Sequence, residues 1–190
     1  MEIPAELIGI LYGDGSICRH HYEVRISLGK KDREYAEYLK ELLRGLGLSP
    51  KEHTKVSTNE IWIRVWSKQF WRLIKKWFKP GRKHLKKPPK NLKDFIKGFF
   101  DTDGCVYIDK KKYPVISIKS KDRNILLLIL GYLHKLGIKA YLYGPETTQF
   151  GSKVYKLRIY GIKNCKIWML KIGTSHPLKR KILESALQPG

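Results

Sequence analysis

The chain repeats itself, and this duplication constrains the fold more than any other feature of the sequence. Four pairs of segments match in the same order along the chain, at shifts of 89 to 94 positions. The pairs are Gly9–Gly15 with Gly98–Gly104, Ile26–Arg33 with Ile116–Arg123, Leu43–Leu48 with Leu133–Ile138, and Ile63–Trp66 with Leu157–Tyr160. Two tandem copies of one unit therefore fill the 190 residues.

Each copy is predicted to contain a helix, a hairpin, a second helix, a second hairpin and a third helix. In the first hairpin, Val24, Ile26 and Leu28 alternate with Arg25 and Ser27, so the strand has one apolar face and one polar face. The apolar face is suited to packing against helices. We therefore expect an α+β fold of two pseudo-symmetric αββαββα subdomains, each an antiparallel sheet covered by helices.

The repeats predict the domain organisation. An N-terminal repeat is expected over residues 1–78 and a C-terminal repeat over 92–190, joined at 79–91 by a basic linker that proline stiffens. Asn91, followed by Asp94 three residues later, predicts a capped start for the second opening helix. Two similar halves side by side would have a pseudo-twofold axis like the local dyad of duplex DNA.

The charge of the chain predicts a polyanionic partner. There are 39 Lys and Arg against 17 Asp and Glu, a net charge of +22, so acidic side chains cannot pair most of the basic ones. No Asp or Glu occurs between Ile61 and Lys93, where many Lys and Arg side chains gather. Nucleic acid is favoured over a membrane surface, because the aromatic residues here have spacings that a core would absorb.

The remaining composition predicts an intracellular protein of the cytoplasm or nucleoid. No apolar run approaches the ~20 residues that span a bilayer, so no membrane partner is expected. The N-terminus lacks the basic start of a signal peptide, and no other targeting signal is visible. Three cysteines are too few for a disulfide scaffold and suit a reducing compartment.

The two opening helices carry small residues one turn apart. Gly9 and Gly13 lie on one helical face, and Gly98 and Thr102 hold the matching places in the second copy. Glycine inside a helix costs about 0.5–1 kcal/mol relative to alanine, so both positions require a reason. Close packing of the two helices, copy against copy, supplies it.

Both helices are predicted to end in a carboxylate, Asp14 and Asp103, followed by Gly15 and Gly104 in the left-handed conformation that terminates helices. A carboxylate faces the negative end of the helix dipole there, and a divalent cation would reverse that penalty. Two such carboxylates, brought together by the packed helices, could hold cations that activate water for attack on a phosphodiester. The predicted metal ligands are oxygen donors: Asp14, Asp103 and the carbonyls of Gly13 and Thr102.

Leu7–Gly15 and Ile96–Gly104 resemble the two motifs of single-chain LAGLIDADG homing endonucleases. The resemblance covers nearly the whole chain. It implies a saddle of two curved four-stranded sheets over double-stranded DNA, with Asp14 and Asp103 as the essential acids. It further implies a monomer that cuts both strands across the minor groove of a long, asymmetric site with Mg²⁺ and leaves 3′ extensions. Mn²⁺ is expected to substitute, and Ca²⁺ to support binding without cleavage.

The chain departs from the family pattern at a few positions. Tyr12 replaces the first, non-catalytic acid, which Asp101 keeps in the second copy; both are expected to contact a neighbouring helix or cap. The family places a basic residue near each active site, for which Lys119 is the candidate in copy two. Gly29 occupies the matching place in copy one, so Lys30 is the nearest substitute. These lysines would stabilise the reacting phosphate or position the attacking water. Alternatively, they would contact the DNA backbone. Because the two copies differ here, the two half-sites are expected to be cut at unequal rates.

Antiparallel strands in the major groove read bases through alternate side chains. The predicted reading residues are Ser16, Cys18, His20, Arg25, Ser27, Trp62 and Arg64 in copy one and Cys105, Tyr107, Asp109, Ser117, Lys119, Lys156 and Arg158 in copy two. Phosphate contacts are expected from the hairpin-turn lysines Lys110, Lys111, Lys112 and Lys153. About half of these side chains are expected to miss base edges. A buried role is predicted for the aromatic residues Trp66, Phe70, Trp71, Trp77 and Phe78.

Other functions fit the sequence less well. Asp109-Lys110-Lys111 is similar to a step in restriction-type nucleases, but that interpretation leaves Asp14 and the duplication unexplained. A maturase that folds its own intron RNA, or a non-cleaving DNA-binding protein of the same fold, stays open as an alternative. An intein origin is not favoured, because the C-terminal residues lack splice-junction Cys or His-Asn, and an intron-encoded protein is expected.

Overall fold

The computed structural model describes residues 2–18, 21–79, 84–110 and 113–188. The first copy contains α1 (Ala5–Asp14), β1 (Gly15–Ile17), β2 (Glu23–Gly29), η1 (Lys30–Asp32), α2 (Arg33–Gly45), β3 (Lys51–Lys55), η2 (Val56–Thr58), β4 (Glu60–Trp66) and α3 (Lys68–Lys75). The second contains α4 (Leu92–Asp103), β5 (Gly104–Asp109), β6 (Tyr113–Ser120), α5 (Arg123–Lys135), β7 (Ala140–Thr147), β8 (Lys153–Tyr160), α6 (Ile162–Lys171) and α7 (Pro177–Leu187). The predicted order of helices and hairpins is confirmed, and α7 is an added element.

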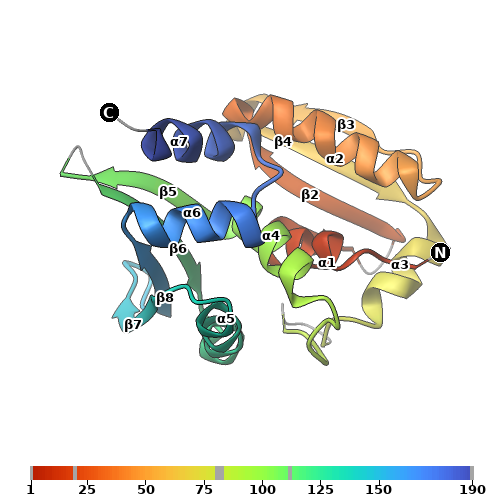
Figure 1. Ribbon diagram of the computed structural model, residues 1–190. Helices are drawn as coiled ribbons and strands as arrows, with labels where there is room; N and C mark the ends of the chain where they lie inside the picture. Colours follow the sequence, from red (N-terminus) through yellow and green to blue (C-terminus); the bar gives the residue numbers. More distant parts are fainter. Residues whose placement is uncertain (1, 19–20, 80–83, 111–112, 189–190) are drawn as a thin grey trace.

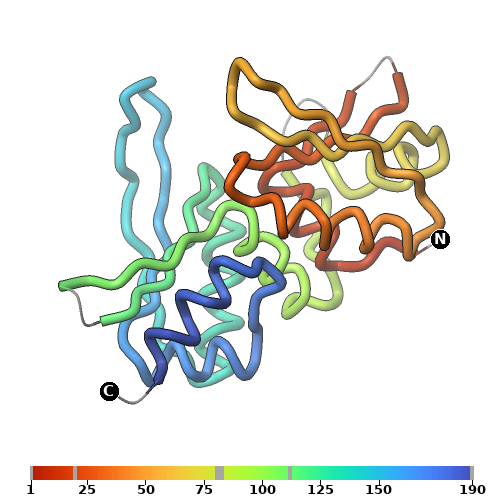
Figure 2. Tube along the Cα trace, turned by 90° about the horizontal axis from the view of Figure 1, so that it is seen from above, coloured from red at the N-terminus to blue at the C-terminus, as the bar shows by residue number. Residues whose placement is uncertain are grey.

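The two copies form equivalent antiparallel sheets (Figure 1). Their strand orders are β1-β2-β4-β3 and β5-β6-β8-β7, so each first hairpin pairs with the last strand of its own copy. Residues 31–50 and 121–140 share the same sequence of buried, half-buried and exposed positions. Figure 2 shows the copies side by side, with α1 and α4 between the sheets. The α+β class with two pseudo-symmetric subdomains is therefore confirmed.

The polar and apolar alternation of the strands sets which face meets the helices. Val24, Ile26 and Leu28 are at most 5% exposed and lie in the core, whereas Arg25 and Ser27 are half-buried on the opposite face. That opposite face of each sheet is called the outer face below. The core positions pack against helices because an apolar side chain gains about 25 cal/mol for each Å² removed from water.

Trp66 is one departure from the sequence expectation. It is 48% exposed, although it was predicted to be buried with the other aromatic residues. It has the same alternation parity as Trp62 and Arg64, which places it on the outer face of β4. Phe70 and Phe78 are buried as predicted, and Trp71 and Trp77 pack partly buried against the core.

The contact between α1 and α4 depends on its glycines. A methyl group on Gly9 would lie 2.1 Å from the Phe95 carbonyl oxygen, and one on Gly98 would lie 2.1 Å from the Glu6 carbonyl oxygen. Neither backbone can move without separating the helices. The predicted close approach of the opening helices is confirmed, and it brings their C-terminal ends together.

The predicted left-handed conformation after each opening helix is wrong. Gly15 has φ −77° and Gly104 has φ −86°, so the chain leaves each helix directly in extended form and begins a strand. Glycine is required for a different reason: a methyl group would lie 2.4 Å from the Leu11 carbonyl oxygen or 2.5 Å from the Phe100 carbonyl oxygen. The tight helix-to-strand turn leaves no room for a side chain.

The predicted start of α4 is confirmed. The Asn91 side-chain oxygen accepts a hydrogen bond from the Asp94 backbone N–H at 3.1 Å, and the Asn91 amide donates to the Asp94 carboxylate at 2.6 Å.

Within the described part of the chain, no helix is long and apolar enough to cross a bilayer.

Candidate catalytic centre and nucleic-acid interface

Asp14 and Asp103 are the last residues of α1 and α4, and both line one cavity of about 580 Å³. Asp14 is half-buried, and Asp103 is exposed. The two helix ends are close: a methyl group on Gly13 would lie 3.4 Å from the Asp103 carboxyl carbon. The other residues lining this cavity are Tyr12, Gly13, His84, Ser120, Lys121 and Asp122.

The oxygen atoms at these helix ends fit a hard divalent cation. The predicted carbonyl ligands belong to Gly13 and Thr102, next to the two carboxylates. The Thr102 hydroxyl donates to the carbonyls of Gly98 and Phe99 at 3.2 and 3.1 Å, so it faces back into its own helix. Of the described residues, no three His, Cys, Asp or Glu side chains cluster to hold a metal. A cation here would depend on two carboxylates, backbone carbonyls and water or phosphate oxygens, a ligand set that Mg²⁺ accepts.

A smaller cavity of about 220 Å³ lies on the other side of Asp14, and Lys179 of α7 lines it. The Lys179 ammonium donates to the carbonyls of Phe100 and Asp101, both at 2.7 Å. Burial lowers the pKa of Lys179 to about 8, against the opposing charges of Asp101 and Asp14. No sequence pattern pointed to Lys179, because α7 lies outside the matched repeats.

The candidate catalytic lysines lie outside both cavities. Lys30 is exposed in η1, and Lys119 is exposed on the outer face, where its register partner in β8 is Lys156. Other lysines line the cavities: Lys31 and Lys179 line the smaller one, and Lys121 lines the larger one. Lys31 and Lys121 both come just before an aspartate at the N-cap position of a helix, Asp32 for α2 and Asp122 for α5. The catalytic roles of Lys30 and Lys119 stay predictions.

Tyr12 and Asp101 make the structural contacts expected of them. The Tyr12 ring packs edge-on against Phe99 of α4 with a centroid separation of 4.9 Å. Asp101 is 2% exposed and accepts hydrogen bonds from the Thr174 hydroxyl and, at 2.9 Å, from the Ser175 backbone N–H. Burial raises the pKa of Asp101 to about 6, although these hydrogen bonds oppose the shift.

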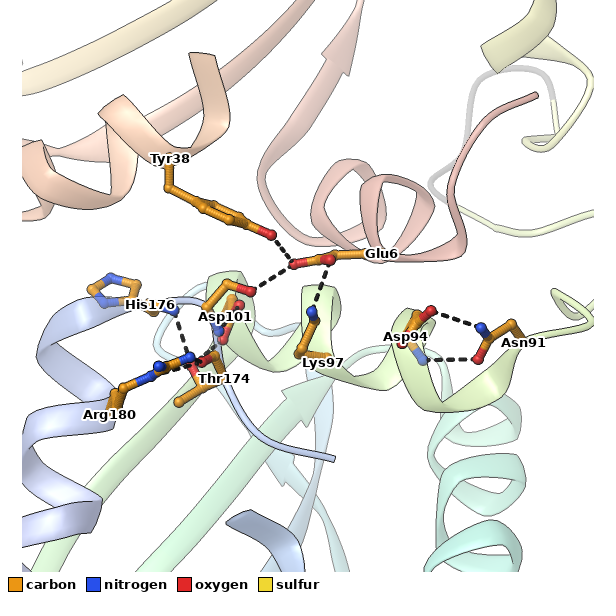
Figure 3. A network of polar contacts seen from close by, with 10 residues as sticks. Glu6, Tyr38, Asn91, Asp94, Lys97, Asp101, Thr174, His176 and Arg180 are labelled. Carbon is orange, nitrogen blue, oxygen red and sulfur yellow. Dashed lines mark hydrogen bonds and ion pairs between the residues drawn. The ribbon is translucent and has the colours of Figure 1, made fainter. Parts of the chain in front are cut away.

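Glu6 connects the opening helices to the segment before α7 (Figure 3). It accepts hydrogen bonds from the Tyr38 hydroxyl at 2.7 Å and the Ser175 hydroxyl at 2.8 Å, and it forms an ion pair with Lys97 at 2.9 Å. At 9% exposure, a glutamate requires such partners. Together with Asp101, it fixes the relative position of α1, α2, α4 and the C-terminal segment.

The outer face of the first sheet presents two arginines supported by tryptophan. Arg25 stacks on Trp62 at 4.3 Å from the ring centroid, and Arg64 stacks on Trp66 at 4.5 Å. Arg64 also donates two hydrogen bonds to Glu23, at 2.9 and 2.8 Å, and this contact lowers the pKa of Glu23. The arginines are direct register partners on β2 and β4. Ser16 continues the same row on β1, Ser27 lies on the same face, and Cys18 is half-buried beyond β1.

The outer face of the second sheet is richer in tyrosine. Arg158 lies over Tyr143 at 5.5 Å and donates to the Tyr160 hydroxyl at 3.4 Å, and Lys156 forms an ion pair with Glu146. Ser117 belongs to this face by register but is 3% exposed, so the structure does not present it to solvent as predicted. The exposed predicted contacts are Cys105, Tyr107, Asp109, Lys110, Lys119 and Lys153. The predicted contacts His20, Lys111 and Lys112 lie outside the described residues.

Two four-stranded sheets with polar outer faces, joined by helices that end in paired carboxylates, define the two-motif endonuclease fold that the sequence predicted. A family model described as a LAGLIDADG-like domain matches residues 2–77 and 91–173. The chain therefore belongs to the LAGLIDADG family.

Several curated proteins are similar in sequence. The homing endonuclease I-ApeI of Aeropyrum pernix is 26% identical over 196 residues, which cover 95% of this chain and 85% of that protein. An uncharacterized protein of Methanocaldococcus jannaschii is 28% identical over 163 residues, or 80% of this chain. The DNA polymerase of Thermococcus kodakarensis is 23% identical over 205 residues, or 97% of this chain. The chain spans 60% of the length of the Methanocaldococcus protein and 12% of the polymerase.

Solved structures confirm the fold. A structure of mesophilic variants of the homing endonuclease I-DmoI superimposes with a TM-score of 0.63 at 20% identity, covering 95% of this chain and 96% of the other. I-DmoI in complex with DNA and Ca gives a TM-score of 0.62 at the same identity and coverage.

Proposed function

We propose that this chain is a site-specific endodeoxyribonuclease that cuts both strands of a long, asymmetric target. The observation that carries the proposal is the shared cavity of Asp14 and Asp103 at the ends of two tightly packed helices. Two carboxylates this close repel each other and face the negative helix ends, and a divalent cation would offset both effects. A protein that only bound DNA would gain nothing from carboxylates beside phosphates.

We further propose that Mg²⁺ occupies this site, with Asp14, Asp103 and the carbonyls of Gly13 and Thr102 as ligands. When bound, such a cation lowers the pKa of a water molecule and stabilises the charge that develops on phosphate. Lys31 and Lys121 line the two cavities, one in each. Their ammonium groups can hold phosphate oxygens by charge-assisted hydrogen bonds. Mn²⁺ is expected to replace Mg²⁺, and I-DmoI has been solved with DNA and Mn.

The outer faces supply the DNA contacts in this proposal. Arg25, Arg64 and Arg158 lie on strands that can enter the major groove, each braced by an aromatic ring. The two faces carry different side chains, so the two half-sites are expected to differ in sequence. One chain contains both copies, and therefore a monomer suffices. Cleavage across the minor groove would leave 3′ extensions.

Cleavage of a randomised duplex library tests this function without knowledge of the target. The purified protein is incubated with Mg²⁺ or with EDTA, and the cut ends are sequenced. The proposal predicts metal-dependent cutting at one long, non-palindromic site. Folded protein that shifts DNA but never cuts such a library would contradict it.

RNA binding is the second candidate function, and the charge of +22 favours it because it suits any polyanion. Gel-shift titration with RNA transcribed from the sequence that flanks the reading frame, beside an unrelated RNA of equal length, tests this candidate. Preference for the flanking RNA would support a maturase activity, with or without DNA cleavage, and equal binding of both RNAs would contradict it.

A further inference from the structure

Two histidines pair with equivalent aspartates across the interface between the copies. His84, which follows the first copy, places Nδ1 2.8 Å from Asp122 of the second copy. His176, which follows α6 of the second copy, places Nε2 3.2 Å from Asp32 of the first copy. Asp32 and Asp122 are matched positions of the internal repeat. The segment that follows each first or second set of strands therefore contributes an imidazole that contacts an aspartate of the other copy.

The surroundings of the two rings differ. The His176 side chain is 6% exposed and stacks on Tyr35 at 4.6 Å, and its Nδ1 is buried with no hydrogen-bond partner in the described chain. Burial and the charge of Lys179 lower the pKa of His176 to about 4, despite the neighbouring Asp32. The His84 side chain is 39% exposed and lines the larger cavity together with Asp14 and Asp103.

Asp122 fixes the tautomer of His84. Its carboxylate also accepts hydrogen bonds from the Tyr12 hydroxyl at 3.4 Å and from the backbone N–H of Asn124 at 3.0 Å. Burial opposes ionisation, but hydrogen bonds from His84 and the helix N–H groups lower the pKa of Asp122. An ionised carboxylate only accepts hydrogen bonds, so Nδ1 of His84 must carry the proton. In the neutral ring, Nε2 then has the free lone pair.

We propose that His84, oriented by Asp122, is a catalytic residue that takes a proton from the water attacking one of the two scissile phosphates. As the water oxygen bonds to phosphorus, its proton moves to Nε2 of His84. The bond from phosphorus to the 3′ oxygen breaks, and that oxygen leaves with the electron pair and takes a proton from a second water. His176 cannot act in this way for the other strand, because its ring is enclosed. The inference rests on the proposed endonuclease function.

The test is strand-resolved, single-turnover cleavage of the mapped target by His84→Ala and Asp122→Asn. Each variant is expected to slow one strand by about 10²-fold, so that nicked duplex accumulates. High concentrations of imidazole should restore that strand in His84→Ala but not in Asp122→Asn. DNA affinity in Ca²⁺ and the melting temperature of His84→Ala should stay at wild-type values. His134→Ala is the matched control, because that ring contacts the Ala140 carbonyl away from the centre.

Each outcome decides the question. Rescue of one strand by imidazole supports a proton-transfer role when the rescued rate rises with the basicity of substituted imidazoles, because a base that only filled the cavity would show no such dependence. Wild-type cleavage rates in His84→Ala, or a loss with no rescue and a lower melting temperature, would overturn the inference and leave the proposed function intact. Wild-type protein that never cuts would overturn both.

Discussion

The two copies have one fold but differ in what surrounds their shared centre. In the first motif Tyr12 lies against α4, whereas Asp101 at the matching place is buried and holds the segment before α7. Both aspartates line the larger cavity together with His84, whereas only Asp14 lines the smaller cavity, together with Lys179. Duplication thus fixes the scaffold and the two acids, while the elements that follow each copy distinguish the two sides of the centre.

The largest expected effect tests whether the two acids are equivalent. Asp14→Asn and Asp103→Asn should each abolish double-strand cleavage, because each removes a charged ligand from a site of two carboxylates. DNA binding in Ca²⁺ should survive in both, as measured by gel shift. Loss of binding in both variants would mean that the carboxylates are structural.

The next effect tests the symmetry of the helix contact. Gly9→Ala and Gly98→Ala should each lower the free energy of unfolding by about 1–3 kcal/mol or more, because the added methyl groups collide with backbone. Denaturant titration measures the loss. Gly131→Ala is the matched control: it lies inside α5 with nothing within 4 Å of the added methyl group. It should gain about 0.5–1 kcal/mol, and equal behaviour of all three variants would refute the packing role.

The free energy of unfolding should depend on pH through Asp101, which has no acidic counterpart in the first motif. Its pKa of about 6 in the folded chain exceeds the ordinary 3.8. The native state therefore binds more protons between these values, and the free energy of unfolding should fall as pH rises from about 4 to about 6. The change is on the order of 1–3 kcal/mol. Asp101→Asn should flatten this part of the stability curve, and an unchanged slope would show that Asp101 is not its source.

The smallest effect concerns the exposed lysines first considered as catalytic. Lys119→Ala should slow cleavage more than Lys30→Ala, because Lys119 lies within β6 at the position that matches Gly29, whereas Lys30 is a substitute just beyond β2. Single-turnover rates measure the difference. Equal rates would remove this asymmetry between the copies and direct attention to Lys31 and Lys121, which line the cavities.

The sequence predicted most of the scaffold because its signals are local or repeated. Alternation in the strands, the Asn91 cap and the small residues of α1 and α4 each depend on neighbours a few positions away. The left-handed conformation predicted for Gly15 and Gly104 was wrong. A glycine that is needed to avoid a collision with a carbonyl cannot be told from one that adopts a positive φ by sequence alone.

The residues around the site were harder to predict from the sequence. His84, His176 and Lys179 reach the centre from segments more than 30 positions away from the groups that they contact. No periodicity links such residues, and α7 has no partner in the repeat.

Mapping both cut ends of the target, with and without Mg²⁺, tests the central claim most directly. The wild-type chain should cut both strands at staggered positions across one minor groove, leave 3′ extensions and stop in EDTA. A double Asp14→Asn, Asp103→Asn variant should cut neither strand. Cleavage that persists in EDTA or in that variant would contradict an endonuclease centred on the paired carboxylates.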